Sequence, residues 1–312
     1  MKIEDVQNVL IVGSGTMGRQ IGLQCVLHGY AVTLYDIQPA ALEAAVIQIK
    51  SYADQMVANG ASEAQVMAAL GRINTTASLA DAAADADLVS ESVLENPALK
   101  GEVFARLNAV CPAHTIFTTN TSSLKPSQFA AATGRPARFC AFHFHQPVWT
   151  SNVVDIMPHP GTSPEVVDLL LAFARCIDQI PIFLHKESAN YVFNAMLDAV
   201  LREAVTLAAN DVASVEDIDR AWMGVTKMTI GPFGILDLVG LDLAWDITQR
   251  TTRWVSFLPQ VRRIRNLIKQ RVVQGKLGVK SKHGFYTYPH PVYQQPGFVS
   301  GEREPVMAPA RD

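Results

Sequence analysis

Three glycines constrain the fold of this chain most strongly, because they stand between an apolar run and a helical stretch. Residues 9–12 read Val-Leu-Ile-Val, and the pattern G-x-G-x-x-G follows at Gly13, Gly15 and Gly18. The first glycine permits a tight turn, the second lets the backbone approach a ligand, and the third lets the helix pack closely on the strand. We therefore predict a strand, a glycine turn and a helix whose N-terminus faces a phosphate.

Short β-branched runs alternate with alanine-rich helical stretches through the first half of the chain. The runs are residues 9–12, 31–35, 87–92, 115–119, 138–144, 152–157 and 180–184, with a further strand near Ile73. This alternation predicts a mainly parallel sheet covered by helices. Residues 40–70 are expected to form one or two long helices, broken near Asn59-Gly60, as an arm inserted after the second strand.

A carboxylate follows the second predicted strand. Asp36 lies about twenty residues after the glycine turn, where it can accept hydrogen bonds from both ribose hydroxyls of an adenosine. It would repel a 2′-phosphate, so the cofactor predicted is NAD rather than NADP. The contacts expected from this motif are Gly13, Gly15, Thr16, Met17, Gly18 and Asp36.

From residue 186 onward the pattern changes to helices only. Ser188 is expected to cap the first of them, another is expected after Ser214, and Gly231-Pro232 is expected to begin a further one. The predicted fold class is α/β, with a Rossmann-like NAD-binding domain that carries a helical-arm insertion and an all-α C-terminal domain after it. The predicted domains are residues 1–187 and residues 188–312.

Composition argues against several functions. The formal net charge of −3 gives no overall pull toward nucleic acid or an acidic membrane, and the basic stretch from Arg262 to Arg271 is more simply a solvated helix face than a phosphate site. No apolar run approaches the ~20 residues of a membrane helix and no secretory signal is expected, so we predict a cytoplasmic protein. The four cysteines form no CxxC pair, which argues against structural zinc.

Six groups of residues occur in the order found in L-3-hydroxyacyl-CoA dehydrogenases. They are residues 95–100, 120–123, 138–144, 190–194, 231–233 with 240–242, and 284–286. Because they span nearly the whole chain, it resembles that family well beyond a shared glycine turn. Val148-Trp149 and residues 120–127 resemble the branch with a bacterial diketoreductase, and residues 157–160 resemble the branch of L-gulonate 3-dehydrogenase and lambda-crystallin.

The resemblance implies a catalytic constellation. His143 would be the general base that takes the proton of the 3-hydroxyl as hydride leaves for nicotinamide, and Asp155, where the family has a glutamate, would orient its ring. Ser122 and Asn194 would hydrogen-bond the reacting oxygen. Contacts to the cofactor would come from Glu95, Lys100, Asn120, Ser122, Gln146 and Lys280.

Simpler interpretations of these side chains stay open. His143 could be a buried, hydrogen-bonded core histidine, and Ser122 a plain turn residue. His143 and His145 project from one strand face, so a metal pair is conceivable, but no third ligand falls at a recognisable spacing and no metal is expected. Asn194 could belong to a solvated helix stripe. The charged side chains that could be ordinary surface residues are Glu95, Lys100 and Lys280.

The helical arm departs from the family pattern. Mitochondrial-type members bind the CoA nucleotide partly through a lysine-rich arm, whereas Lys50 is the single basic residue of residues 40–70 here. Tyr52 and Asn59 stand where the family has a CoA-contacting serine and lysine, and Trp149 places a bulky ring near the pocket. Phosphate recognition normally needs such charges, so a substrate without CoA is an open alternative.

The leading prediction is NAD-dependent oxidation of a short-chain L-3-hydroxyacyl group, as its CoA thioester, to the 3-oxo compound, as in fatty acid metabolism. One alternative keeps the chemistry with a CoA-free 3-hydroxy acid or a diketo ester. Another is a non-catalytic, crystallin-like NAD-binding protein, which could retain every motif. By resemblance, apolar faces around residues 235–243 would pair two subunits through the C-terminal domain as a homodimer.

Overall fold

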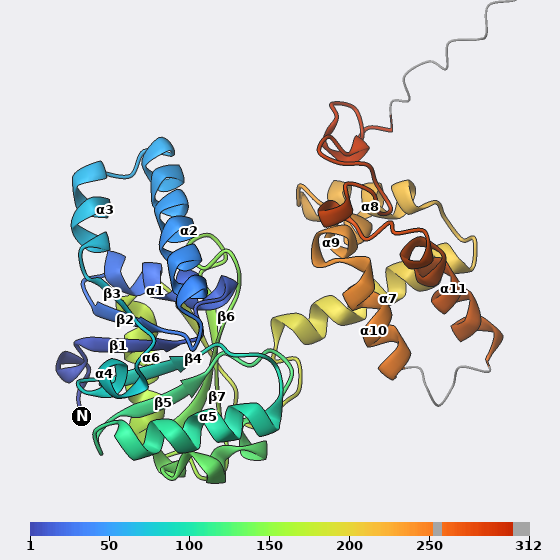
Figure 1. The fold of residues 1–312 in the computed structure, drawn as a ribbon. Helices are drawn as coiled ribbons and strands as arrows, with labels where there is room; N and C mark the ends of the chain where they lie inside the picture. Colours follow the sequence, from blue (N-terminus) through green and yellow to red (C-terminus); the bar gives the residue numbers. More distant parts are fainter. Residues whose placement is uncertain (252–257, 302–312) are drawn as a thin grey trace, which may run out of the picture. The chain divides into compact units, whose positions relative to one another are not determined.

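The chain folds into two compact units in the computed structural model, which describes residues 1–251 and 258–301 (Figure 1). The units are Met1–Ala195 and Met196–Asp312. The first unit contains the whole sheet and the second is helical, as the change of pattern after residue 186 predicts.

An eight-stranded sheet in the order β3-β2-β1-β4-β5-β6-β7-β8 forms the centre of the first unit. Its strands are β1 (Asn8–Val12), β2 (Ala31–Tyr35), β3 (Ile73–Thr76), β4 (Leu88–Glu91), β5 (Ile116–Thr119), β6 (Phe139–Phe144), β7 (Val153–Pro158) and β8 (Ile180–Phe183). Every neighbouring pair is parallel except β6 and β7, so the expectation of a mainly parallel sheet is confirmed. The strand order reverses between β1 and β4, which is where α/β sheets open a ligand crevice.

Both faces of the sheet are buried. In β1, Val9 and Ile11 join one hydrophobic cluster while Leu10 and Val12 join the other, as the alternation of side chains along a strand requires. The helices α1 (Thr16–Leu27) and α6 (Pro164–Cys176) contribute to the first cluster, and α4 (Leu79–Ala83) and α5 (Pro97–Val110) to the second. A strand covered on both sides explains why residues 9–12 are continuously apolar.

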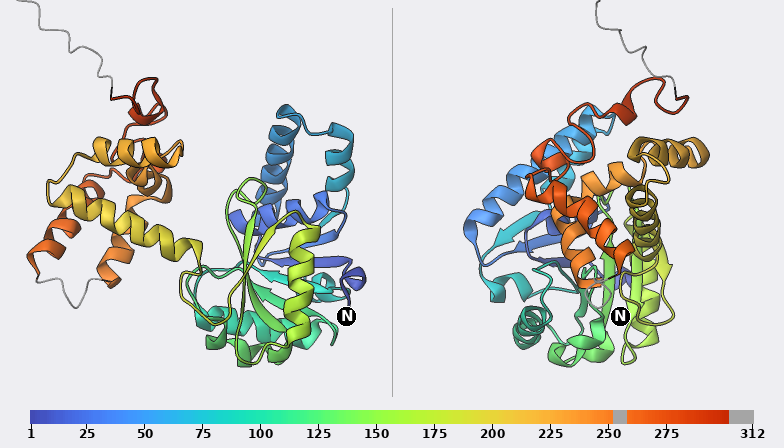
Figure 2. Two further views of the ribbon diagram at one scale, coloured as in Figure 1. Left: turned by 180° about the vertical axis from the view of Figure 1, so that it is seen from behind. Right: turned by 90° about the vertical axis from the view of Figure 1, so that its right-hand side faces the viewer.

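The arm after β2 consists of two helices that lie side by side, as the blue segments of Figure 2 show. They are α2 (Pro39–Ala58) and α3 (Glu63–Leu70), and the break between them falls at Asn59-Gly60 as predicted. Gly60 has φ +99°, a left-handed conformation that reverses the chain at little cost only for glycine.

The second unit contains α8 (Val215–Thr226), α9 (Pro232–Val239), α10 (Leu241–Thr251), α11 (Pro259–Val273) and most of α7 (Phe193–Ala209). Ser214 accepts a hydrogen bond from the Asp217 amide and caps α8, and α9 begins directly after Gly231; both predicted starts are confirmed. Arg262, Arg263 and Lys269 are exposed on α11, which fits a solvated face. Short 3-10 turns occur at Ile3–Asp5, Pro126–Gln128, Ala130–Thr133, Pro136–Arg138, Val279–Ser281 and Val292–Gln294.

The predicted cap at Ser188 is wrong. Helix α7 begins at Phe193 because Asn190 and Tyr191 have φ +66° and +53°, which no right-handed helix accommodates. The Tyr191 side chain is 2% exposed and its hydroxyl donates a hydrogen bond to the Thr121 carbonyl at 2.6 Å. Burial of this ring therefore fixes the local backbone against helix propensity. Among the described residues, no helix has both the length and the apolar character needed to cross a bilayer.

Candidate active site

The glycine turn joins β1 to α1 and has space for a ligand. A Cβ on Gly13 would lie 2.8 Å from the Ser92 carbonyl oxygen, and one on Gly18 would lie 1.9 Å from the Gly13 oxygen, so neighbouring backbone excludes side chains at both positions. A Cβ on Gly15, by contrast, would meet no atom within 4 Å. Gly15 precedes the first turn of α1, where free amides and the helix dipole favour an anion. The turn therefore fits a dinucleotide pyrophosphate.

A cavity of about 320 Å³ lies beside this turn, between the ends of β1, β2 and β4. Asp36 lines it, and one carboxylate oxygen accepts hydrogen bonds from the Ser14 amide at 3.0 Å and hydroxyl at 2.9 Å. Apolar side chains, among them Ile37, Leu79 and Leu99, line much of the rest, and Gln38, Glu102 and Arg106 also line the cavity. A fixed carboxylate beside an apolar slot suits an adenosine, with the ribose at Asp36 and the base against the apolar wall.

A second cavity, of about 520 Å³, shares Gly15, Ser92, Val93 and Leu94 with the first, so the two adjoin. It gathers residues from five separate segments of the first unit. The predicted site residues that line it are Gly15, Thr16, Met17, Glu95, Lys100, Asn120, Ser122, His143, Gln146 and Asn194. All predicted site residues of this unit except Gly18 and Asp155 thus line one or the other of the two adjoining cavities.

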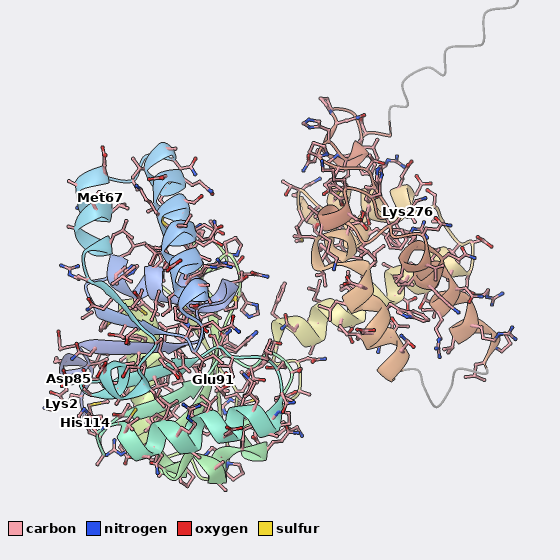
Figure 3. The ribbon with its side chains drawn as sticks, in the orientation of Figure 1. Lys2, Met67, Asp85, Glu91, His114 and Lys276 are labelled. Atoms are coloured by element: carbon pink, nitrogen blue, oxygen red, sulfur yellow. The ribbon has the colours of Figure 1, made fainter. Side chains whose placement is uncertain are left out.

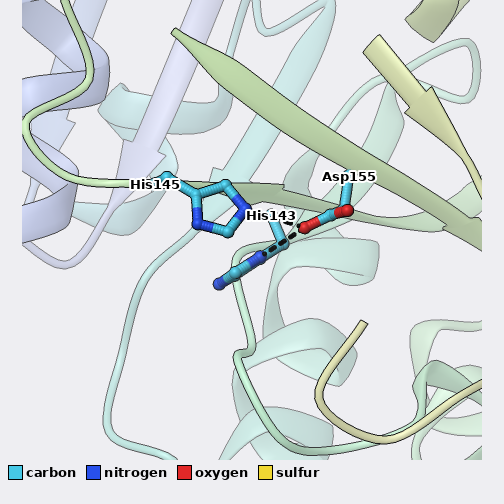
Figure 4. A group of neighbouring side chains, drawn as sticks. All are labelled: His143, His145 and Asp155. Carbon is cyan, nitrogen blue, oxygen red and sulfur yellow. Dashed lines mark hydrogen bonds and ion pairs between the residues drawn. The ribbon is translucent and has the colours of Figure 1, made fainter. Parts of the chain in front are cut away.

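His143 and Asp155 form a buried pair across the antiparallel strands β6 and β7. The two residues are register partners, and His143 Nδ1 lies 3.1 Å from Asp155 Oδ2 (Figure 4). His143 is 5% exposed and Asp155 is 0% exposed. Because Nδ1–H donates a hydrogen bond to the carboxylate, Nε2 of the neutral ring is left as a proton acceptor. Figure 4 shows this nitrogen pointing away from Asp155.

The electrostatics of the pair suit a base. Burial opposes ionisation of Asp155, but hydrogen bonds from His143 and His145 outweigh it and hold the pKa of this carboxyl below its usual range. Burial also disfavours the imidazolium, so the pKa of His143 is below its usual value although the bond to Asp155 acts in the opposite direction. At neutral pH the carboxylate is therefore charged and the imidazole is neutral.

His145 lies against the same carboxylate, a contact that the sequence alone does not reveal. Its Nε2 is 2.9 Å from Asp155 Oδ2. The sequence spacing indicates no third ligand for the two histidines, but the fold brings Asp155 to them, and the ligand atoms of His143, His145 and Asp155 lie within 4.8 Å of one another. Both nitrogens are at hydrogen-bond distance from one oxygen, so shared protons account for this arrangement.

Tyr191 is a site residue that sequence reasoning missed. Its ring stacks on that of His143, with centroids 4.4 Å apart and planes inclined by 14°. Tyr191 stands within the segment 190–194 that carries Asn194, but nothing in the sequence distinguishes it from the neighbouring apolar residues. The stack restricts rotation of the His143 ring and keeps Nδ1 directed at Asp155.

Lys100 is the centre of a buried ion-pair network. Its side chain is 1% exposed, so its interpretation as a surface charge is wrong. Its Nζ lies 2.7 Å from Glu91 Oε1, 3.3 Å from the Val93 carbonyl and 3.4 Å from Glu95 Oε2. Glu91, labelled in Figure 3, is the last residue of β4 and is fully buried; sequence reasoning missed it as well.

Glu95 holds the turn that carries Ser122. Its Oε1 accepts hydrogen bonds from the Thr121 hydroxyl at 2.5 Å and from the Ser122 and Ser123 amides at 2.9 Å each. Burial opposes ionisation of Glu95, but the Thr121 hydrogen bond and the Lys100 charge lower its pKa below the ordinary value. Glu95 is therefore an ionised acceptor that fixes residues 121–123 at the cavity.

Three further predicted site residues, Asn120, Asn194 and Lys280, lie on different elements. The Asn120 side-chain oxygen accepts the Phe144 amide at 2.8 Å and so ties the end of β5 to the end of β6. Asn194 stands in the first turn of α7 and is partly buried at the cavity wall. Lys280 belongs to the second unit, where its ammonium pairs with the Asp242 carboxylate.

Two family models match the chain. The model for the NAD binding domain of 3-hydroxyacyl-CoA dehydrogenase matches residues 8–188, and the model for the C-terminal domain of the same enzyme matches residues 191–288. The chain is 30% identical to a probable 3-hydroxybutyryl-CoA dehydrogenase of Bacillus subtilis over 285 residues, covering 91% of this chain and 98% of the relative.

Two further comparisons agree with these matches. The chain is 32% identical to mitochondrial hydroxyacyl-coenzyme A dehydrogenase of Rattus norvegicus over 291 residues, covering 91% of each protein. The chain is also 38% identical to a diketoreductase of solved structure, whose description is substrate-directed dual catalysis of dicarbonyl compounds. It superposes with a TM-score of 0.82 over 91% of this chain and 99% of that one.

Proposed function

We propose that this chain, which belongs to the 3-hydroxyacyl-CoA dehydrogenase family, oxidises an L-3-hydroxyacyl group to the 3-oxo compound with NAD as hydride acceptor. One observation carries this proposal: a neutral His143, paired with an ionised Asp155, lines a cavity continuous with the glycine turn. A proton acceptor is thereby placed beside the predicted position of the cofactor.

In the proposed reaction, His143 Nε2 accepts the proton of the 3-hydroxyl as the C3–H bond breaks. Bound NAD supplies the hydride acceptor. Asp155 holds the ring in the Nδ1–H form and stabilises the imidazolium that results. Ser122 and Asn194, at the same cavity, donate hydrogen bonds to the reacting oxygen and orient it for transfer.

The cofactor would lie along the two adjoining cavities. The Gly13–Gly18 turn, including Thr16 and Met17, would receive the pyrophosphate, and Asp36 would receive the ribose. At the nicotinamide end, Asn120 and Gln146 would contact the cofactor, as would Lys280. Glu95 and Lys100 would act there mainly by fixing the adjacent turn, because their charges already have protein partners.

The helical arm supports the second candidate, a substrate without CoA. Lys50 is the single basic residue in residues 40–70. Tyr52, instead of being free to meet a ligand, packs on Trp149 with ring centroids 5.1 Å apart. Likeness to a diketoreductase structure points the same way. A phosphate-bearing CoA would find few charges on this arm.

A substrate panel tests the proposal. The rate of NADH oxidation is measured with acetoacetyl-CoA, acetoacetate, dehydrogulonate and a 3,5-dioxo ester, each repeated with NADPH. We expect the highest kcat/KM with acetoacetyl-CoA, and a preference for NADH over NADPH of at least about tenfold, because Asp36 repels a 2′-phosphate. Comparable rates without CoA would select the second candidate. No turnover by protein that binds NADH would favour a non-catalytic, crystallin-like role.

We further propose that the helical unit pairs two copies of the chain. Leu238, Val239, Leu243 and Ile247 are 42% to 66% exposed, which is an unusual concentration of apolar surface. Sedimentation at micromolar concentration should give twice the chain mass of 34.0 kDa, and Leu243→Glu should give the single mass. Val225→Glu, at an exposed position of α8, is the matched control. A monomeric wild-type protein contradicts this proposal.

We also propose a cytoplasmic location for the protein and a role in fatty acid metabolism.

A further inference from the structure

Two histidines share the Asp155 carboxylate, and the reaction proposed above uses only one of them. His143 lies on β6, and His145 directly follows the last residue of that strand, with its amide still 3.4 Å from the Val153 carbonyl oxygen. Two residues apart on extended backbone, the two rings project to the same side. Asp155 Oδ2 lies 3.1 Å from His143 Nδ1 and 2.9 Å from His145 Nε2 (Figure 4). The second contact is at least as short as the first.

All side-chain hydrogen bonding of Asp155 goes through this one oxygen. Asp155 is 0% exposed, and its Oδ1 is buried without a hydrogen-bond partner among the described residues. The two imidazole N–H groups therefore set the orientation of the carboxylate together. Each ring also contacts an aromatic ring: His143 stacks on Tyr191, and His145 forms a T-shaped pair with Phe193, with ring centroids 5.5 Å apart.

We propose that His145 is a positioning residue that holds Asp155 and takes a share of its negative charge, so that His143 is a weaker base than an unshared carboxylate would make it. This inference rests on the proposed function, because it concerns the proton acceptor of that reaction. His145 acts through Asp155 and needs no contact with the substrate.

Electrostatics give the sign of this effect. An oxygen that accepts two N–H groups presents less negative potential to each of them than to a single donor. The His145 ring, whose centroid lies 4.8 Å from that of His143, also lowers the pKa of His143. The other ionisable groups around His143 are Glu95, whose charge favours the imidazolium, and the stacked Tyr191. Removal of His145 leaves Asp155 and Glu95 in place, so His143 becomes more basic.

Two substitutions at position 145 distinguish the effect of the N–H hydrogen bond to Asp155 from the effect of the aromatic ring itself. His145→Phe keeps an aromatic ring against Phe193 but has no N–H group, whereas His145→Gln places an amide N–H near the position of Nε2. In the pH profile of kcat/KM for oxidation, we expect the acid limb of His145→Phe to move up by roughly half to one pH unit. We expect His145→Gln to remain within about 0.3 unit of the wild type.

The same shift is measurable without turnover. An NMR titration of the His143 ring in the free protein should show the higher pKa in His145→Phe and not in His145→Gln, even if no substrate is found. Should His145→Phe fail to fold, His145→Asn replaces it, since its shorter amide does not reach Asp155. Superimposable titrations of His143 in all variants, or an equal shift in His145→Gln and His145→Phe, would overturn the proposal.

Discussion

Replacing His143 with asparagine is expected to lower kcat by about 10²–10⁴-fold, while the affinity for NADH stays unchanged. The asparagine amide can still donate a hydrogen bond near the Nδ1 position, so Asp155 keeps that partner. What disappears is Nε2, the proton acceptor. Steady-state oxidation rates and a fluorescence titration with NADH separate the two quantities. The exposed His185 provides the control, since His185→Asn should match the wild type.

The pH dependence of oxidation gives this prediction a second measure. Oxidation needs the neutral imidazole, and burial sets the pKa of His143 below the ordinary 6.5. The rate should therefore rise with pH through a limb centred below pH 6.5 and stay level above it, and His143→Asn should lose that limb. Undiminished turnover in His143→Asn would end the proposed mechanism, whichever substrate is used.

The part of the fold that sequence predicts best is the part with the strongest repeating pattern. Strands buried on both faces must be apolar at every position, and residues 9–12 are; the glycine turn and Asp36 then follow from the need to place a phosphate and a ribose. The break at Asn59-Gly60 was predictable for a similar reason, because a left-handed residue has few substitutes for glycine. Such features depend on local chemistry alone.

Tertiary contacts decide the features that were mispredicted. Ser188 has the residue type of a helix cap, but the buried Tyr191 ring and its bond to Thr121 hold the backbone out of a helix until Phe193. Local propensity is worth less than burial of an aromatic side chain, so the helix start moves. No pattern within residues 188–193 records a partner seventy residues away.

The site shows the same division between pattern and contact. Alternation along β6 and the residue that follows it correctly places His143 and His145 on one side. Asp155 comes from a different strand, so the shared oxygen could be recognised only from the register of β6 on β7. The roles assigned to the site residues by family resemblance stay predictions until the variants are measured. Lys100 could be recognised as buried only through Glu91, because an unpaired lysine is almost never buried.

Lys100→Met is expected to destabilise the protein by about 3–5 kcal/mol, which is the largest stability effect we predict. Lys100 and Glu91 are 1% and 0% exposed and lie 2.7 Å apart. Removing the ammonium leaves the Glu91 carboxylate with the Thr119 hydroxyl and the Val93 amide as hydrogen-bond donors but no positive charge beside it. Urea unfolding gives the change in the free energy of unfolding, and Lys50→Met, on the exposed face of α2, should change it by no more than about 0.5 kcal/mol.

A double variant distinguishes the stability that the ion pair contributes from the free-energy cost of leaving Glu91 charged and without a cation. In Glu91→Gln/Lys100→Met the buried carboxylate becomes a neutral amide that can still accept from Thr119, so the double variant should be more stable than Lys100→Met alone. In that case the ion pair serves mainly to fix the position of β4 against the first turn of α5 and contributes little net stability. If Lys100→Met has the same urea midpoint of unfolding as the wild type, the prediction of a buried ion pair is contradicted. The turn that carries Glu95 and Ser122 must then be held by other contacts.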